Sequence, residues 1–213
     1  MIESSTGFPS RAARAKASAL HGSQLNIYYF ARSLAASAAK EFTNTEVYNG
    51  LMFALRYVAV LSLVVWAGGL LALGAIAAPS IFAVLAITQP DNGRMLAGAL
   101  FGEILRRFHL VGYAAGALLL ATLLLRRVLG PAPRRFAWRA GIATLMLSAT
   151  AYSGLVVAAR IAQIQAEIGV APSTLPAGDA RRVEFGRLHG LSTALELIPV
   201  LGGLMLMYWE IKE

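Results

Sequence analysis

Four stretches of the chain are almost continuously apolar, and short segments rich in glycine, proline or arginine separate them. These stretches are residues 57–87, 108–125, 140–159 and 188–209. Crossing the hydrocarbon core of a bilayer takes about 20 residues of helix, whereas the strands of a membrane barrel are shorter and alternate in polarity. Every backbone N–H and C=O in lipid must also be paired within its own segment. The pattern therefore predicts an all-α fold, an integral membrane four-helix antiparallel bundle.

The composition agrees with a membrane protein. The 213 residues are 57% hydrophobic and 14% charged, and the mean hydropathy is +0.62. A soluble domain has about 25% charged residues, so this is not the composition of a water-facing enzyme. The chain has no cysteine, which excludes disulfides, zinc–thiolate sites and a thiol nucleophile. It also has no nucleophile elbow, phosphate-binding loop or metalloprotease motif. We therefore expect a protein that is not an enzyme and has no catalytic residues.

The basic residues predict how the bundle is oriented. The net charge of +8 comes from 19 Lys and Arg against 11 Asp and Glu. Twelve of these basic residues lie on the side of the two termini and the second loop, and seven lie on the opposite side. Cytoplasmic loops are enriched in Lys and Arg. We therefore expect both termini to be cytoplasmic, in an inner or plasma membrane.

Residues 1–50 differ from the rest, because they are rich in alanine, serine and spaced arginine, and Glu3 is the only acid before Glu41. We interpret them as an N-terminal amphipathic arm that lies along the headgroups, with residues 1–40 on anionic lipid. A targeting segment is the alternative. No nucleic-acid-binding motif is present, so nucleic acid is not an expected partner. The transmembrane domain is then residues 51–213.

Glycines on the second predicted helix favour close packing. They form two pairs with four-residue spacing, Gly98 with Gly102 and Gly112 with Gly116. Small residues at this spacing let helix backbones approach closely in lipid. The pairs predict a compact bundle. Trp66, on the first helix, is either an anchor at the membrane interface or part of the core.

Polar stripes run along the last three predicted helices. Ionisable side chains within lipid are costly, so each is a candidate functional position. Residues that recur every three or four positions share one helix face. The stripes are Arg106, His109 and Tyr113; Thr144, Ser148 and Tyr152; and His189, Ser192, Thr193 and Glu196.

His109 and His189 are each the second residue of an apolar stretch, and their helices run parallel in the predicted bundle. We therefore expect the two imidazoles to lie at matched depth and to face each other. Such a pair provides the axial ligands of a haem or another tetrapyrrole, because neutral imidazole binds the metal well in a dry bundle. The alternative, which we favour, is that each histidine hydrogen-bonds a neighbouring helix and no cofactor is bound.

Glu196 lies two helical turns beyond His189, about 10 Å deeper in the apolar region. One interpretation is a protonated carboxyl that donates to a side chain such as Tyr152 or Ser148. The other is a proton or cation relay with His189. The residues of this candidate proton, ion or packing site are Glu196, Ser192, Thr193, Tyr113 and Tyr152.

The last helix also carries a family resemblance. The run Phe185-Gly-Arg-Leu-His-Gly-Leu-Ser-Thr-Ala-Leu-Glu-Leu resembles the last helix of the transmembrane protein 205-like family, domain of unknown function 4149. The segments Leu100-Phe101 to Phe108-His109 and Ala78-Pro79-Ser80-Ile81-Phe82 are similar to its second helix and first hairpin. The resemblance covers residues 51–213, and Glu196 stands where relatives tend to carry Asn. It implies no established chemistry, although vertebrate relatives are associated with tolerance to platinum drugs, which implies transport or trafficking.

Three interpretations of the function follow. The first is a non-catalytic accessory or structural subunit of a larger membrane assembly, with other membrane subunits and the lipid bilayer as partners. The second is a tetrapyrrole- or metal-binding redox subunit that uses His109 and His189. The third is a small proton- or cation-coupled transporter that uses Glu196.

Overall fold

The computed structural model describes residues 32–33 and 45–212. Contacts within the chain divide it into two units, Met1–Gly50 and Leu51–Glu213. The predicted amphipathic arm, with its proposed lipid-binding residues 1–40, lies almost wholly outside the described residues. The site and the bundle described below belong to Leu51–Glu213.

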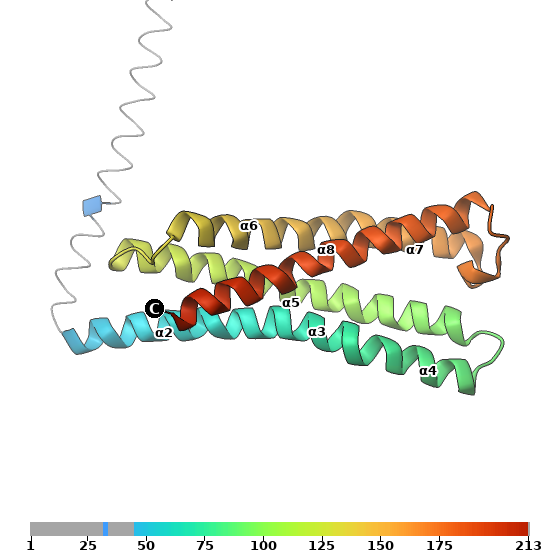
Figure 1. Cartoon of the computed structure of the whole chain (residues 1–213), viewed down its shortest axis with the longest axis horizontal. Helices are drawn as coiled ribbons and strands as arrows, with labels where there is room; N and C mark the ends of the chain where they lie inside the picture. The colour runs from blue at the N-terminus through green and yellow to red at the C-terminus, as the bar shows by residue number, and fades with distance from the viewer. Residues whose placement is uncertain (1–31, 34–44, 213) are drawn as a thin grey trace, which may run out of the picture. The chain divides into compact units, whose positions relative to one another are not determined.

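Four long helices make up the described part of the second unit, and no strand occurs among the described residues (Figure 1). Each helix is long and apolar enough to cross a membrane. The predicted all-α membrane bundle is therefore confirmed. The first helix runs through α2 (Thr45–Leu63), η1 (Val64–Gly68), α3 (Gly69–Ala72), η2 (Leu73–Ala77) and α4 (Ala78–Thr88). The second is α5 (Gly93–Leu129), and the third runs through α6 (Phe136–Tyr152), η3 (Ser153–Val157) and α7 (Ala158–Ile168). A short 3₁₀ turn, η4 (Pro172–Thr174), precedes the fourth helix, α8 (Ala180–Ile211).

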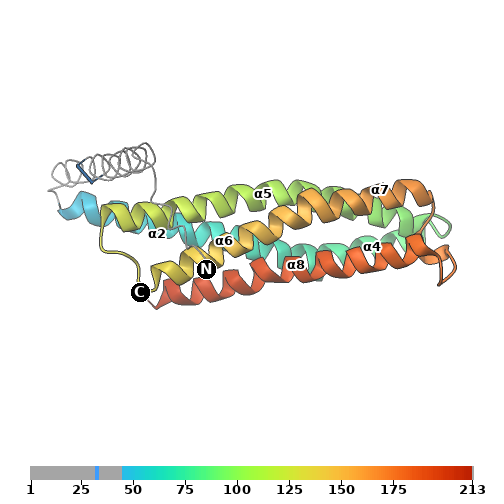
Figure 2. The same ribbon diagram turned by 90° about the horizontal axis from the view of Figure 1, so that it is seen from above.

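The four helices form a closed ring of neighbours. The first packs on the second through α4 and α5, the second on the third through α5 and α6, and the third on the fourth through α6 and α8. The fourth then returns to the first, where α8 contacts η1. Figure 2 shows α5, α6 and α8 side by side along the bundle. This arrangement lets one interior site draw side chains from several helices.

The loops contain residues that stop and start helices. Gly169 ends α7 in the left-handed conformation, with φ of 68°, which glycine adopts without steric cost. Asp179 caps α8, because its carboxylate accepts a hydrogen bond of 2.9 Å from the backbone N–H of Arg181. Hydrogen bonds from the side chain and the backbone of Arg181 lower the pKa of the Asp179 carboxyl from its ordinary value. The cap is therefore ionised at neutral pH.

Trp66 lies in the core and not at the membrane interface, since its side chain is fully buried. Its indole fills the space beside Gly112 and Gly116 of α5. A Cβ atom at either glycine would lie 2.9 Å from the indole, too close for real contact. The second glycine pair of the predicted helix therefore accommodates a large side chain from the first helix. At Gly203 a Cβ would instead lie 2.7 Å from the Ala67 methyl, so α8 and η1 approach closely there.

Candidate functional site

A buried group of polar side chains joins the second, third and fourth helices. We call it the central polar cluster: His109 of α5, Ser153 of η3, and Ser192 and Glu196 of α8. Nε2 of His109 lies 2.8 Å from Oε1 of Glu196, and the Ser153 hydroxyl donates to the same oxygen at 2.8 Å. The hydroxyl oxygens of Ser153 and Ser192 are 3.4 Å apart. The side chain of His109 is 3% exposed and that of Glu196 is 16% exposed. A titratable pair is thus enclosed within the bundle.

Tyr113 and Gly154 fix the orientation of the His109 ring. The Tyr113 ring stacks one helical turn away on the same face of α5, with centroids 6.3 Å apart and an interplanar angle of 12°. Gly154 supplies the other wall, because a Cβ there would lie 2.9 Å from the imidazole and would also collide with the Tyr113 hydroxyl. Glycine at this position therefore allows both rings to pack directly against the third helix.

Four buried side-chain atoms of this region have no hydrogen-bond partner among the described residues. They are Nε1 of Trp66, Nδ1 of His109, Oγ1 of Thr150 and Oε2 of Glu196. Trp66 and Thr150 meet beside Gly112, one turn along α5 from His109, where a Cβ would touch both. Buried polar atoms in proteins are nearly always paired. The interior around the cluster therefore has unused capacity to donate and accept hydrogen bonds.

Ser153 of the central polar cluster and the neighbouring Trp66 both lie in π-helical turns and are both buried. Ser153 begins η3, and Trp66 is the middle residue of η1. A π-turn adds a residue to one turn of a helix, which rotates the face that follows, and such turns occur frequently at functional sites. On α8, Pro199 lies one turn beyond Glu196 and has no backbone N–H to donate within the helix. Three of the four helices thus depart from regular α-helical bonding close to the cluster.

The expectation that His109 and His189 face each other is wrong. His109 pairs with Glu196 in the interior, while His189 is exposed and stacks on Phe185 of its own helix. The reason is depth: α5 begins at Gly93 and α8 at Ala180, so His109 lies about two helical turns further into its helix than His189 does. Counting from the start of each apolar stretch misses this offset. The two imidazoles therefore do not form the geometry of an axial ligand pair.

The structure brings only some of the other predicted residues together. Ser192, Glu196 and Tyr113 join His109, but Thr193 is exposed and donates to the His189 carbonyl at 3.0 Å. Tyr152 is exposed too, as are Thr144 and Ser148, so the polar stripe predicted on the third helix faces away from the interior. Ser153 takes the place expected for Tyr152 or Ser148 as the partner of Glu196. The inner face of α6 is instead lined by Met146, Ala149 and Thr150.

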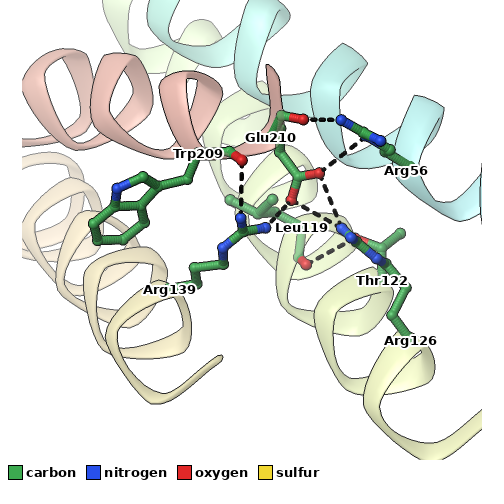
Figure 3. Close-up of polar contacts among 7 residues, drawn as sticks. All are labelled: Arg56, Leu119, Thr122, Arg126, Arg139, Trp209 and Glu210. Carbon is green, nitrogen blue, oxygen red and sulfur yellow. Dashed lines mark hydrogen bonds and ion pairs between the residues drawn. The ribbon is translucent and has the colours of Figure 1, made fainter. Parts of the chain in front are cut away.

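A second buried cluster, which sequence reasoning missed, lies toward the end of α8. We call it the arginine cluster: Glu210 with Arg56 of α2, Arg126 of α5 and Arg139 of α6 (Figure 3). Arg126 and Arg139 donate to Oε1 of Glu210 at 2.8 and 2.6 Å, and Nε of Arg56 lies 3.6 Å from Oε2. The side chain of Glu210 is 4% exposed. One carboxylate therefore ties together all four helices.

Backbone carbonyls complete the arginine cluster. Arg56 donates to the carbonyl oxygen of Glu210, and Arg139 donates to that of Trp209 at 3.0 Å. These carbonyls belong to the last turn of α8, where the helix lacks its own donors. The sequence pattern identifies the three arginines only as flanking charges that orient the bundle. The available signal was Glu210 itself, an acid within the last turn of a helix whose end lies among basic residues.

A family model for a domain of unknown function, DUF4149, matches residues 61–169. The match spans just over half of the chain, and four membrane-capable helices accompany it. The chain is thus a helical integral membrane protein, and it belongs to the DUF4149 family. The matched region contains His109 and Ser153, whereas Glu196 and Glu210 lie beyond its end. No curated protein and no solved structure matches the chain significantly.

Proposed function

We propose that this DUF4149 protein is a small proton- or cation-coupled membrane transporter in which His109 and Glu196 bind and release the coupling proton. The observation that carries the proposal is the contact of 2.8 Å between Nε2 of His109 and Oε1 of Glu196 in the bundle interior. Ionisable groups in membrane-spanning segments are rare and typically mark ion pathways or proton relays. The closer kinship to the transmembrane protein 205-like family, which implies transport or trafficking, is part of the same proposal.

The contact between a nitrogen and an oxygen lets the pair share one proton. With one shared proton it is either imidazole with carboxylic acid or imidazolium with carboxylate, and both forms carry no net charge. Loss of that proton to the solution leaves a net charge of −1 in a poorly solvated interior, which is costly. Binding of a cation, or of a new proton, removes this cost. The pair therefore favours exchange of one positive charge for another.

Neighbouring groups support such an exchange. Ser153 donates to the oxygen that His109 contacts, so its hydroxyl stabilises the ionised carboxylate. Nδ1 of His109 and Oε2 of Glu196 have no other partner in the described part of the chain, and they can hold the entering ion or proton. The third helix contains the π-turn η3, and α8, which carries Glu196, contains Pro199. Both helices are therefore less regular near the pair.

Proton flux into proteoliposomes tests the proposal. A pH-sensitive dye inside the vesicles would report acidification after a membrane potential is imposed. We expect the parent protein to acidify the lumen and Glu196→Gln to abolish this flux. The matched control is Glu184→Gln on the same helix, because Glu184 pairs with Arg160 at 2.8 Å and both side chains are about 40% exposed. Its flux should equal that of the parent.

Two results would contradict the proposal. If Glu196→Gln carries the same flux as the parent, the site assignment is wrong. If the parent carries no proton flux and no cation flux in the same vesicles, the central polar cluster serves packing, and the accessory or structural role expected from the sequence is the one that remains.

A further inference from the structure

A pocket of about 630 Å³ opens beside the arginine cluster, at the end of the bundle where α6 begins and α8 ends. Arg134, Arg135 and Arg139 line it from the start of the third helix, and Tyr208, Trp209 and Lys212 line it from the end of the fourth. Four of these six side chains are cationic. The pocket has the size of a small-molecule site, and its charge is that of an anion site.

One wall of the pocket is formed by a buried arginine that hydrogen bonds hold in place. Arg139 is 3% exposed, and its guanidinium is fixed by Glu210 Oε1 at 2.6 Å and by the Trp209 carbonyl at 3.0 Å. Figure 3 shows the Arg139 guanidinium between the Glu210 carboxylate and the Trp209 carbonyl. The position of this cation therefore does not depend on solvent or on a ligand.

Two further cations of the pocket contact aromatic rings and no acid within the described residues. The guanidinium of Arg135 lies 5.6 Å from the centre of the Trp209 ring, and the ammonium of Lys212 lies 4.8 Å from that of Tyr208. A ring face orients a cation without neutralising it. Glu210 is already held by three arginines, so it does not balance the charge of Arg135 or Lys212.

The backbone at the pocket is strained to place one of these cations. Arg135 has a φ of 57°, and it is the one residue other than glycine with a left-handed backbone in the described part of the chain. This conformation is sterically unfavourable for a residue with a Cβ. Strain of this kind persists where the surrounding structure imposes it, often at ligand sites. Here it aims the guanidinium toward Trp209 at the pocket wall.

From these observations we propose that the pocket binds a phosphate group, with Arg135 and Lys212 as its principal ligands and Arg139 as a fixed positive charge behind them. Arginine forks and lysine ammonium groups are the side chains that bind phosphate oxygens best. Basic pockets between membrane helices bind the headgroups of anionic lipids. Tyr208 and Trp209 are residue types that concentrate at the level of the headgroups. The phosphate therefore belongs to an anionic phospholipid of the bilayer or to a soluble phosphate compound.

Lipid binding by the full chain in nanodiscs tests the first source. Nanodiscs would contain phosphatidylcholine and phosphatidylglycerol, and native mass spectrometry would count each lipid retained by the protein. We expect the parent to prefer phosphatidylglycerol and Arg135→Gln/Lys212→Gln to lose roughly tenfold of this preference. The matched control is Arg94→Gln/Arg187→Gln, which removes the same charge from exposed positions near the starts of α5 and α8. All variants retain residues 1–40, so any lipid contact of the arm is equal among them.

A second arm tests the soluble source. Inorganic phosphate would be titrated onto the full chain in nanodiscs of phosphatidylcholine alone, and the midpoint of thermal unfolding would be recorded. A rise in the parent and the control but not in the pocket variant assigns the site to a soluble phosphate. If the double variant does not fold, Lys212→Gln and the charge-conserving Arg135→Lys replace it, and only the former should lose binding. Equal behaviour of pocket and control variants in both arms would overturn the proposal.

Discussion

His109 and Glu196 are separated by 87 positions in the chain, and their side chains meet at 2.8 Å in the interior of the bundle. The contact joins α5 to α8, and the side chains of His109 and Glu196 are only 3% and 16% exposed. Each group makes the burial of the other less costly, because each satisfies a hydrogen-bonding atom of its partner. The two residues are therefore energetically coupled. Replacing one of them leaves the other buried without this hydrogen bond, which lowers stability.

Replacing the two histidines should therefore give very different results. His109→Ala leaves Glu196 buried without its partner, and we expect the free energy of unfolding to fall by about 3 kcal/mol. His189→Ala removes an exposed ring and should change it by less than about 0.5 kcal/mol. Thermal unfolding of the detergent-solubilised protein measures both. Equal losses in the two variants would show that the exposed position of His189 is wrong.

Gly154→Ala should disturb the central polar cluster without changing its chemistry. The new methyl group would lie 2.9 Å from the His109 ring and against the Tyr113 hydroxyl, so the rings must move. We expect a loss of about 1–3 kcal/mol of stability, as for other overpacked cores, together with a loss of proton flux. Gly141→Ala is the control on the same long helix, since nothing lies within 4 Å of its Cβ position. That variant should gain about 0.5–1 kcal/mol from helix propensity.

Glu210→Gln should be among the most destabilising single changes in the bundle. The amide cannot neutralise the three arginines, so the positive charges of the buried Arg126 and Arg139 remain close together without a counter-ion. We expect a loss of about 3–5 kcal/mol, measured as a lower thermal midpoint in detergent. Glu103→Gln is the control, because Glu103 pairs with Arg106 and Arg107 on the surface of α5. A midpoint unchanged from the parent in Glu210→Gln would mean that the arginine cluster does not hold the helices together.

Arg135→Asn should separate stability from phosphate binding. Asparagine tolerates the left-handed backbone better than arginine, so the variant should gain about 1 kcal/mol of stability while losing a ligand of the phosphate pocket. Arg134→Asn removes a neighbouring charge without relieving strain and should bring no gain. Thermal midpoints and lipid retention in nanodiscs report the two effects. If Arg135→Asn keeps both the phosphatidylglycerol preference and the thermal response to inorganic phosphate of the parent, its guanidinium is not a ligand of the phosphate pocket.

The helices were predictable from the sequence because their signal is local. Long apolar stretches define membrane helices whatever their neighbours are, and the four stretches each lie within one of the four observed helices. Glycine and proline in the loops also mark helix ends. The apolar stretches mark only part of each helix, since α5 begins at Gly93, well before the stretch that starts at residue 108, and so includes Gly98 and Gly102 as the sequence predicts. Polar residues such as Arg106 continue the helix beyond the apolar region.

The sites were less predictable because they depend on how the helices face one another. His109, Ser192, Tyr113 and Glu196 were found as costly polar residues in apolar segments, which is a local signal. Their pairing was not, because a shift of two turns in α5 against α8 exchanges His189 for Glu196 as the neighbour of His109. The π-turn at Ser153 changes the inward face of the third helix, and no periodicity of 3.6 residues anticipates it. Charges at helix ends, such as Arg139, resemble ordinary flanking residues until an acid is found beside them.

The arginine cluster also bears on how the protein is assembled in the membrane. Arg56, Arg126 and Arg139 are synthesised on the first three helices, and the carboxylate that binds them is synthesised on the fourth. During biogenesis the three earlier helices consequently enter the bilayer with cationic groups that lack this counter-ion. Packing of α8 supplies the Glu210 carboxylate and closes the ring of four helices. A chain that ended before α8 would therefore lack both the carboxylate that holds these arginines and the helix that closes the ring.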